Sequence, residues 1–145
     1  MGSVLSIDYG LKRIGLAISD PLRNFAFPLT VIENKSYEFV LNSIIQIIKE
    51  KEVEVIIVGI PYDASGRKVN IPKQKQSMQD IIEDFINRLK HTISIPIEKV
   101  DERYSSFSAE ENLKDAGINS RSSKRFVDME AARLILEDFL SSGLF

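Results

Sequence analysis

Residues 4–19 read VLSIDYGLKRIGLAIS, and this stretch decides the fold. It contains two short apolar runs, from Val4 to Asp8 and from Arg13 to Ser19, joined by a connection that includes Gly10. Apolar residues at a period of two are typical of strands, and a short glycine-containing connection between two strands is typical of a hairpin. The sequence therefore predicts a β-hairpin at the start of the chain.

The rest of the chain alternates between strand and helix patterns. Apolar residues in continuous runs or at a period of two predict strands, and apolar residues three and four apart predict helices. Strands are expected at 29–33, 53–59 and 95–100, and helices at 36–51, 75–90, 106–116 and 123–140. The segment 60–72 has two prolines and no periodicity, so we expect a mobile basic loop there.

The order of these elements, β-β-β-α-β-α-β-α-α, predicts an α/β fold with a mixed five-stranded sheet and helices on both faces. The strand at 53–59 is almost continuously apolar, as central parallel strands are when both faces are covered. Together with the helix 75–90 and the strand 95–100 it forms a βαβ unit, for which a right-handed crossover is expected. At 145 residues, residues 1–145 are expected to form one domain.

Composition excludes several classes of protein. The chain has no cysteine, so it has no disulfide, no thiolate zinc site and no thiol nucleophile. Its one histidine, His91, is expected at a helix end, which leaves little material for imidazole metal clusters. No apolar run reaches the roughly 20 residues of a membrane span and no signal peptide is present, so we expect a soluble cytoplasmic protein without a membrane partner. The net charge of −2 means that any nucleic-acid contact must use a local basic patch.

Two acidic positions follow predicted strands. Asp8 ends the first strand, where it could either serve a site at the carboxyl edge of the sheet or form an Asx turn. Asp101 and Glu102 follow the strand 95–100. Because successive side chains point to opposite sides of a strand, only one of these two is expected to face Asp8.

Asp128 is a third acidic position, in the last predicted helix. The residues three, four and seven positions further on are Ala131, Ala132 and Ile135, which form a small apolar packing stripe. A carboxylate on such a face is close to buried and requires a cation or a basic partner. Lys124 and Arg125, one turn earlier, are the plain structural alternative to a metal.

Carboxylates that converge without histidine or cysteine form a hard oxygen site, which suits Mg²⁺ or Mn²⁺. Two such ions can hold a phosphoryl group for in-line displacement. Basic residues recur beside every acid and in the loop 60–72, and each could contact phosphate or remain a solvated surface charge. They are Lys12, Arg13, Arg67, Lys68, Lys73, Arg103, Lys124 and Arg125.

Four motifs together resemble the signatures of the YqgF (RuvX) family, in the order of that family. They are residues 8–20 (DYGLKRIGLAISD), 59–61 (GIP), 101–103 (DER) and 127–132 (VDMEAA). The resemblance covers essentially the whole chain. One departure is Tyr104-Ser105-Ser106, where the family usually has Leu-Thr-Thr.

This resemblance implies an RNase H-like nuclease related to RuvC resolvases, with magnesium-dependent phosphodiester hydrolysis. It implies that Asp8, Glu102 and Asp128 are the catalytic, metal-binding acids and that Arg13 and Arg103 match motif arginines. The implied partner is precursor 16S ribosomal RNA, at its 5′ end, or branched DNA such as a Holliday junction.

Two other functions remain open from the sequence. One is a non-catalytic nucleic-acid or ribosome-binding module of the same fold. The other is an ATP-binding domain of the actin and sugar-kinase type, which needs two lobes and which the length disfavours. The sequence leaves open the choice between RNA and DNA, endo- or exonucleolytic cutting, and whether the chain forms a homodimer.

Overall fold

A computed structural model of the chain describes residues 2–61, 77–102 and 120–142, with only the backbone for 120–124. The predicted helix 106–116 and nearly all of the predicted loop 60–72 lie outside these residues. None of the helices in the described ranges is long and apolar enough to cross a bilayer.

The described chain contains one mixed five-stranded sheet, as the sequence predicts. Its strands are β1 (Ser3–Asp8), β2 (Arg13–Ser19), β3 (Ala26–Glu33), β4 (Val53–Ile60) and β5 (Ile97–Asp101). Their order across the sheet is β3-β2-β1-β4-β5. The pairs β1–β2 and β2–β3 are antiparallel, which confirms the predicted hairpin, whereas β1–β4 and β4–β5 are parallel. The parallel strands β1, β4 and β5 therefore end at the same edge of the sheet.

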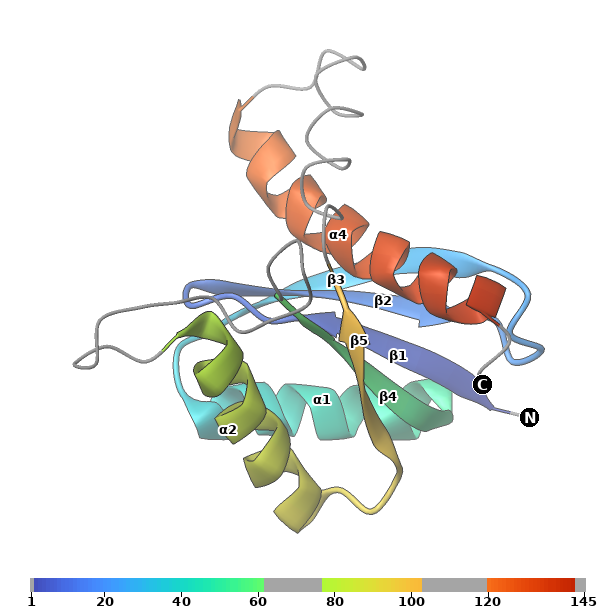
Figure 1. The fold of residues 1–145 in the computed structure, drawn as a ribbon, viewed down its shortest axis with the longest axis horizontal. Coiled ribbons are helices and arrows are strands. Elements are labelled where there is room, and N and C mark those ends of the chain that lie inside the picture. Colours follow the sequence, from blue (N-terminus) through green and yellow to red (C-terminus); the bar gives the residue numbers. More distant parts are fainter. Residues whose placement is uncertain (1, 62–76, 103–119, 143–145) are drawn as a thin grey trace.

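Three helices cover the two faces of the sheet (Figure 1). They are α1 (Tyr37–Lys51), α2 (Met78–Thr92) and α4 (Ser120–Ser142). Helices α1 and α2 lie on one face and α4 crosses the other. Each of the first two begins at a serine, because the hydroxyls of Ser36 and Ser77 accept hydrogen bonds from backbone N–H groups at 3.1 Å and so satisfy donors that the first turn leaves unpaired.

The alternation of side chains along β1 divides the core into two layers. Leu5 and Ile7 belong to the apolar layer under α1 and α2, whereas Val4 belongs to the layer under α4. Ser6 also faces α4, because its hydroxyl donates to the Ala132 carbonyl at 2.8 Å. The period of two along a strand therefore directs Asp8 toward α4 as well.

Strand β3 is longer than the sequence predicts. It begins at Ala26 and not at Leu29, so the predicted start was wrong. Pro28 lies within β3 because β3 is an edge strand, where the missing N–H of a proline can face away from the sheet. Pro28 pairs with Ala17 beside an irregularity in the β2–β3 register.

Two glycines let α4 and its neighbours approach the sheet closely. A Cβ atom added to Gly15 in β2 would lie 1.9 Å from the backbone carbonyl oxygen of Asp128 in α4. A Cβ atom added to Gly59 in β4 would instead meet two side-chain tips, Glu102 Oε2 at 2.5 Å and Ile135 Cδ1 at 2.7 Å. Gly15 therefore sets the distance between two backbones, and Gly59 sets the room for two side chains.

We predict that Gly15→Ala lowers the free energy of unfolding by about 3 kcal/mol, the upper end of the usual effect of overpacking, because a backbone carbonyl cannot move away without displacing α4. Gly59→Ala adds the same methyl group on the same face and is the matched control. It should lower stability by roughly 1 kcal/mol, since side-chain tips can shift. Urea denaturation measures both; equal losses would contradict the close backbone approach.

Candidate active site

The site lies at the sheet edge where β1, β4 and β5 end. Asp8 is the last residue of β1, and Glu102 follows the last residue of β5. The backbone N–H of Glu102 donates to the carbonyl of Ile60 at 3.1 Å, which fixes the Glu102 backbone to the end of β4. Since β1 pairs with β4 and β4 pairs with β5, Asp8 and Glu102 extend from strands on either side of β4.

Both side chains lie on the face of the sheet that α4 covers. The side chain of Glu102 lies over Gly59. Any other residue at position 59 would place its Cβ atom 2.5 Å from Oε2 of Glu102. Val100 also packs into the layer under α4, so the period of two puts Asp101 on the opposite side from Val100 and Glu102. Of the two adjacent acids, the structure therefore brings Glu102, and not Asp101, to Asp8.

Asp8 and Glu102 form a hydrogen-bonded pair of carboxyl groups. Burial raises the pKa of the Asp8 carboxyl well above its ordinary range, and the neighbouring Glu102 raises it further through charge and the hydrogen bond. Burial also raises the pKa of Glu102, the hydrogen bond from Asp8 opposes that shift, and the charge of Asp101 adds to it. Ionising both neighbouring carboxyls is unfavourable without a cation, so the pair favours a shared proton or a bound cation.

Asp128 lies next to this pair but has a partner of its own. Gly15 is opposite Asp8 in the β1–β2 ladder, and Asp128 packs directly over Gly15. The charge of Asp128 is one of the causes that raise the pKa of Asp8. Asp128 Oδ2 accepts a hydrogen bond from Arg13 Nε at 2.7 Å, with the side chains 22% and 38% exposed. Arg13 therefore supplies the basic partner that the packed position of Asp128 requires.

Arg13 is not the basic partner that the sequence predicts for Asp128. Lys124 or Arg125, one turn before Asp128, was the expected basic alternative. Arg125 is exposed and lines a groove with β3 and α1, and the side chain of Lys124 is not described. Arg13 was expected to contact nucleic acid, and its spacing in the sequence gives no sign that α4 crosses β2 at this residue.

The donor set fits a hard divalent cation. The pair Asp8–Glu102 offers only carboxyl oxygens, which Mg²⁺ and Mn²⁺ prefer, and a cation there would replace the proton that the two acids share. Among the residues that the structure describes, no three acidic or histidine side chains form a ready metal cage. Arg13 engages one of the two carboxyl oxygens of Asp128, Oδ2.

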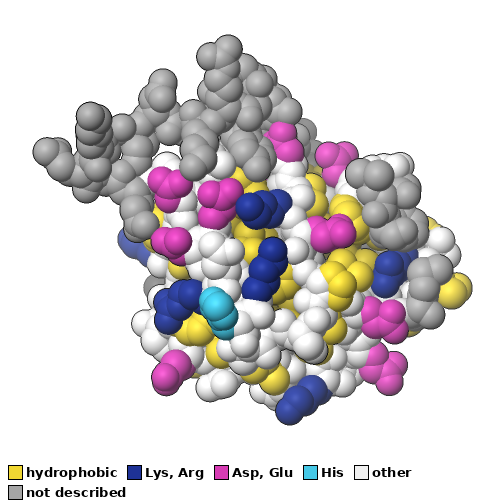
Figure 2. All heavy atoms as spheres, turned by 60° about the horizontal axis from the view of Figure 1, so that its bottom comes forward, with side chains coloured by type: hydrophobic (Ala, Val, Ile, Leu, Met, Phe, Trp, Pro, Cys, Tyr) yellow, Lys and Arg dark blue, Asp and Glu magenta, His cyan; other side chains and the backbone are white. Residues whose placement is uncertain are grey.

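The other predicted contacts are scattered or undescribed. Lys12 is exposed in the β1–β2 turn. Four of the predicted basic residues, Arg67, Lys68, Lys73 and Arg103, lie outside the described residues. On the face shown in Figure 2, the described Lys and Arg side chains alternate with Asp and Glu and form no continuous basic surface.

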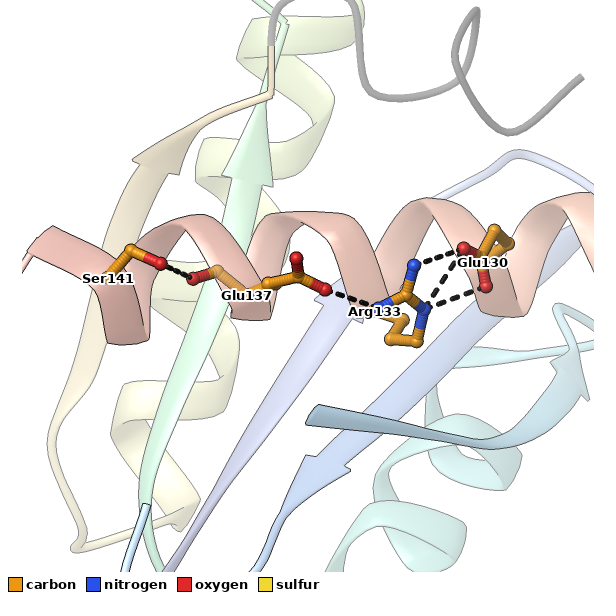
Figure 3. Close-up of polar contacts among 4 residues, drawn as sticks. All are labelled: Glu130, Arg133, Glu137 and Ser141. Atoms are coloured by element: carbon orange, nitrogen blue, oxygen red, sulfur yellow. Dashed lines mark hydrogen bonds and ion pairs between the residues drawn. The ribbon is translucent and has the colours of Figure 1, made fainter. Parts of the chain in front are cut away.

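Helix α4, which carries Asp128, is reinforced by ion pairs between successive turns (Figure 3). Arg133 donates to Glu130 one turn before it, with Nε to Oε2 at 2.9 Å, and to Glu137 one turn after it. These hydrogen bonds raise the pKa of Arg133, which keeps its charge in any case. Each such pair contributes little alone, but together they bridge two turns beyond Asp128.

The fold is shared with solved structures of junction resolvases. RuvC from Thermus thermophilus, in complex with a Holliday junction substrate, superimposes with a TM-score of 0.60 at 12% identity, over 99% of this chain and 98% of that chain. The fowlpox virus resolvase with its Holliday junction DNA gives a TM-score of 0.57 at 12% identity, over 99% of each chain. These likenesses define the class of the fold as the RNase H-like fold of the resolvases.

The family follows from sequence. The model of the RuvX family, described as "Holliday junction resolvase", matches residues 2–142, and the chain belongs to this family. A protein named "Putative pre-16S rRNA nuclease" from Maridesulfovibrio salexigens is 39% identical over 95% of this chain and 97% of its own length. One of the same name from Dictyoglomus turgidum is 39% identical over 96% and 94%. The resemblance in the four motifs is thus confirmed.

We predict that Asp8→Asn stabilises the metal-free protein at pH 8 and has a smaller effect near pH 4. The folded state keeps a proton on the acid pair that the unfolded chain releases above about pH 4, so the stability of the wild type falls as pH rises through the raised folded pKa. Removing one acid should raise the free energy of unfolding by about 1–2 kcal/mol at pH 8, since it relieves a buried charge.

Urea denaturation at several pH values, in the presence of a chelator, measures this difference. Asp138→Asn, on the exposed side of α4, is the control for losing one surface carboxylate. A constant difference between wild type and Asp8→Asn from pH 4 to pH 8 would contradict the shared proton.

Proposed function

We propose that this protein is a metal-dependent endonuclease that hydrolyses phosphodiester bonds in structured nucleic acid. The observation that carries the proposal is the half-buried, hydrogen-bonded pair of Asp8 and Glu102 at the carboxyl edge of the sheet. A half-buried pair of acids destabilises the fold unless a proton, a cation or a basic side chain compensates it, and the position of this pair is the one where open α/β sheets carry their sites. Membership in a family described as a resolvase agrees with this chemistry.

Asp8 and Glu102 would hold Mg²⁺ or Mn²⁺, with Asp128 as the third acid. A bound cation of this kind activates water for attack and neutralises the charge that develops on the phosphate. Arg13 orients Asp128 through the hydrogen bond from its Nε to Oδ2. A guanidinium has several N–H groups in a planar fork, so Arg13 can contact a phosphate oxygen of the scissile strand as well as Asp128.

We propose precursor 16S ribosomal RNA, at its 5′ end, as one substrate, and a branched DNA junction as the other. Relatives named pre-16S rRNA nucleases over almost their whole length support the first. Fold neighbours solved with junction DNA support the second. Both substrates would place a phosphodiester backbone beside the site, and ribosomal RNA would place the protein in the cytoplasm. The contacts to this backbone are assigned to Lys12, Arg13, Arg67, Lys68, Lys73, Arg103, Lys124 and Arg125.

One observation favours a second candidate, a non-catalytic nucleic-acid-binding module of the same fold. Asp128 is paired with Arg13, and in the described part of the chain no third acid completes a metal cage. A protein that used the fold for recognition alone would keep that ion pair when it binds nucleic acid. Cleavage assays separate the two candidates.

We predict that the purified protein cuts labelled precursor RNA or junction DNA with Mg²⁺ or Mn²⁺ and not with a chelator. Glu102→Gln should reduce the cleavage rate by at least about 100-fold, because even outer-sphere partners of a bound metal contribute 10–100-fold. Asp101→Asn is the matched control: it neutralises the adjacent acid on the other side of the strand and should retain most of the activity.

Two outcomes would contradict this proposal. Binding of both substrates without metal-dependent cutting would identify a recognition module. A larger loss from Asp101→Asn than from Glu102→Gln would mean that the wrong acid has been assigned.

A further inference from the structure

A cavity of about 210 Å³ lies at the same sheet edge, on the face covered by α1 and α2. Its walls come from three separate parts of the chain: Tyr9 after β1, Tyr37 at the start of α1, and Phe85 and Arg88 in α2. It is smaller than the roughly 300–1,000 Å³ of pockets for drug-sized ligands. A single planar ring system matches its size better than a larger molecule.

The rings in this cavity pack against one another, and Arg88 covers one of them. The centroids of Tyr9 and Phe85 are 4.6 Å apart, and Tyr37 meets Phe85 edge-on at 6.4 Å. The guanidinium carbon of Arg88 lies 3.7 Å from the centroid of the Tyr37 ring. Aromatic rings and guanidinium planes are the two kinds of group on which proteins stack unpaired bases.

Tyr37 also carries an unused polar atom. Its hydroxyl is buried and has no hydrogen-bond partner among the described residues. A buried hydroxyl without a partner destabilises the folded state, and neither the ring contacts nor the apolar core needs it. A bound ring with nitrogen or oxygen atoms at its edge would supply the missing partner.

The cavity is next to Asp8 in the chain but on the other side of the sheet. Asp8 points toward α4 and contacts Glu102, whereas Tyr9 packs against the apolar layer under α1 and α2. A nucleic-acid strand that crosses the sheet edge could therefore place a phosphate at Asp8 and an adjacent base at Tyr9.

We propose that this cavity binds one unpaired nucleobase of the strand whose phosphate lies at Asp8 and Glu102. The inference rests on the proposed nuclease function and adds a preference to it: the substrate must present a base that is free to leave its stack. Single-stranded ends, bulges and branch points have such bases, whereas a continuous duplex does not. Arg88, which lines the cavity together with Asp84, provides the stacking plane, and Tyr37 provides the hydrogen bond.

The test uses the full chain in the presence of a chelator, so that no strand is cut. A short single-stranded RNA carries one 2-aminopurine, whose fluorescence falls when it stacks, and a second RNA has an abasic residue at that position. Arg88→Ala should weaken binding of the first RNA by roughly tenfold, within the range measured for loss of one stacking group, and should abolish the quenching. Lys90→Ala, an exposed cation on the same helix, is the control and should leave the quenching unchanged.

Tyr37→Phe separates binding from folding. It keeps the ring and removes the orphan hydroxyl, so the free protein should be at least as stable as the wild type while the base binds several-fold more weakly. Equal binding of the abasic and 2-aminopurine RNAs by the wild type would overturn the proposal. So would equal quenching by Arg88→Ala and Lys90→Ala. Adenosine monophosphate that binds as tightly as the RNA would show a site for free nucleotides and would overturn the assignment to a strand.

The two proposals fail in different ways. If the nuclease function is wrong, the wild type cuts nothing with any metal, while the quenching that depends on Arg88 is still observed. If the base site is wrong, metal-dependent cutting continues and the quenching does not depend on Arg88.

Discussion

The structure depends on two half-buried carboxyl groups, those of Asp8 and Glu102, that lie next to each other. Burial is the chief cause that raises the pKa of Asp8 and of Glu102, and no lysine or arginine among the described residues forms an ion pair with either acid. Buried acids commonly form an ion pair with lysine or arginine. Asp128, which packs over the ladder partner of Asp8, forms such a pair with Arg13. Asp8 and Glu102 repel each other, whereas the charge of Asp128 is compensated by Arg13. This arrangement is expected where a metal cation, and not a side chain, binds the two acids.

The pairing of the strands and two glycines position these acids. Parallel pairing brings the ends of β1 and β5 to either side of β4. Gly59 makes room for the Glu102 side chain, and Gly15 lets α4 carry Asp128 over the partner residue of Asp8. The site is therefore built on strands and a helix, which position side chains more accurately than loops do.

Much of this could be predicted from the sequence, because the patterns involved are local. The alternation in residues 4–19 and the helical spacing in 36–51 depend on near neighbours, and both elements are confirmed. Successive side chains of a strand point to opposite faces, and this rule was enough to expect that only one of Asp101 and Glu102 faces Asp8. The contact between Arg13 and Asp128 depends on where α4 crosses β2, across 115 residues of sequence, and no local pattern contains that information. The interior glycines at 15 and 59 were the available signal, since glycine within a strand often marks a close approach.

The most direct measurement is a crystal structure grown with Mn²⁺ and without nucleic acid, in which anomalous scattering locates the ion. We expect a peak between the carboxyl groups of Asp8 and Glu102, and no peak in crystals of Glu102→Gln grown in the same way. A wild-type structure in which the two acids remain hydrogen-bonded to each other without an ion, at saturating Mn²⁺, would contradict the proposal that this pair is a cation site.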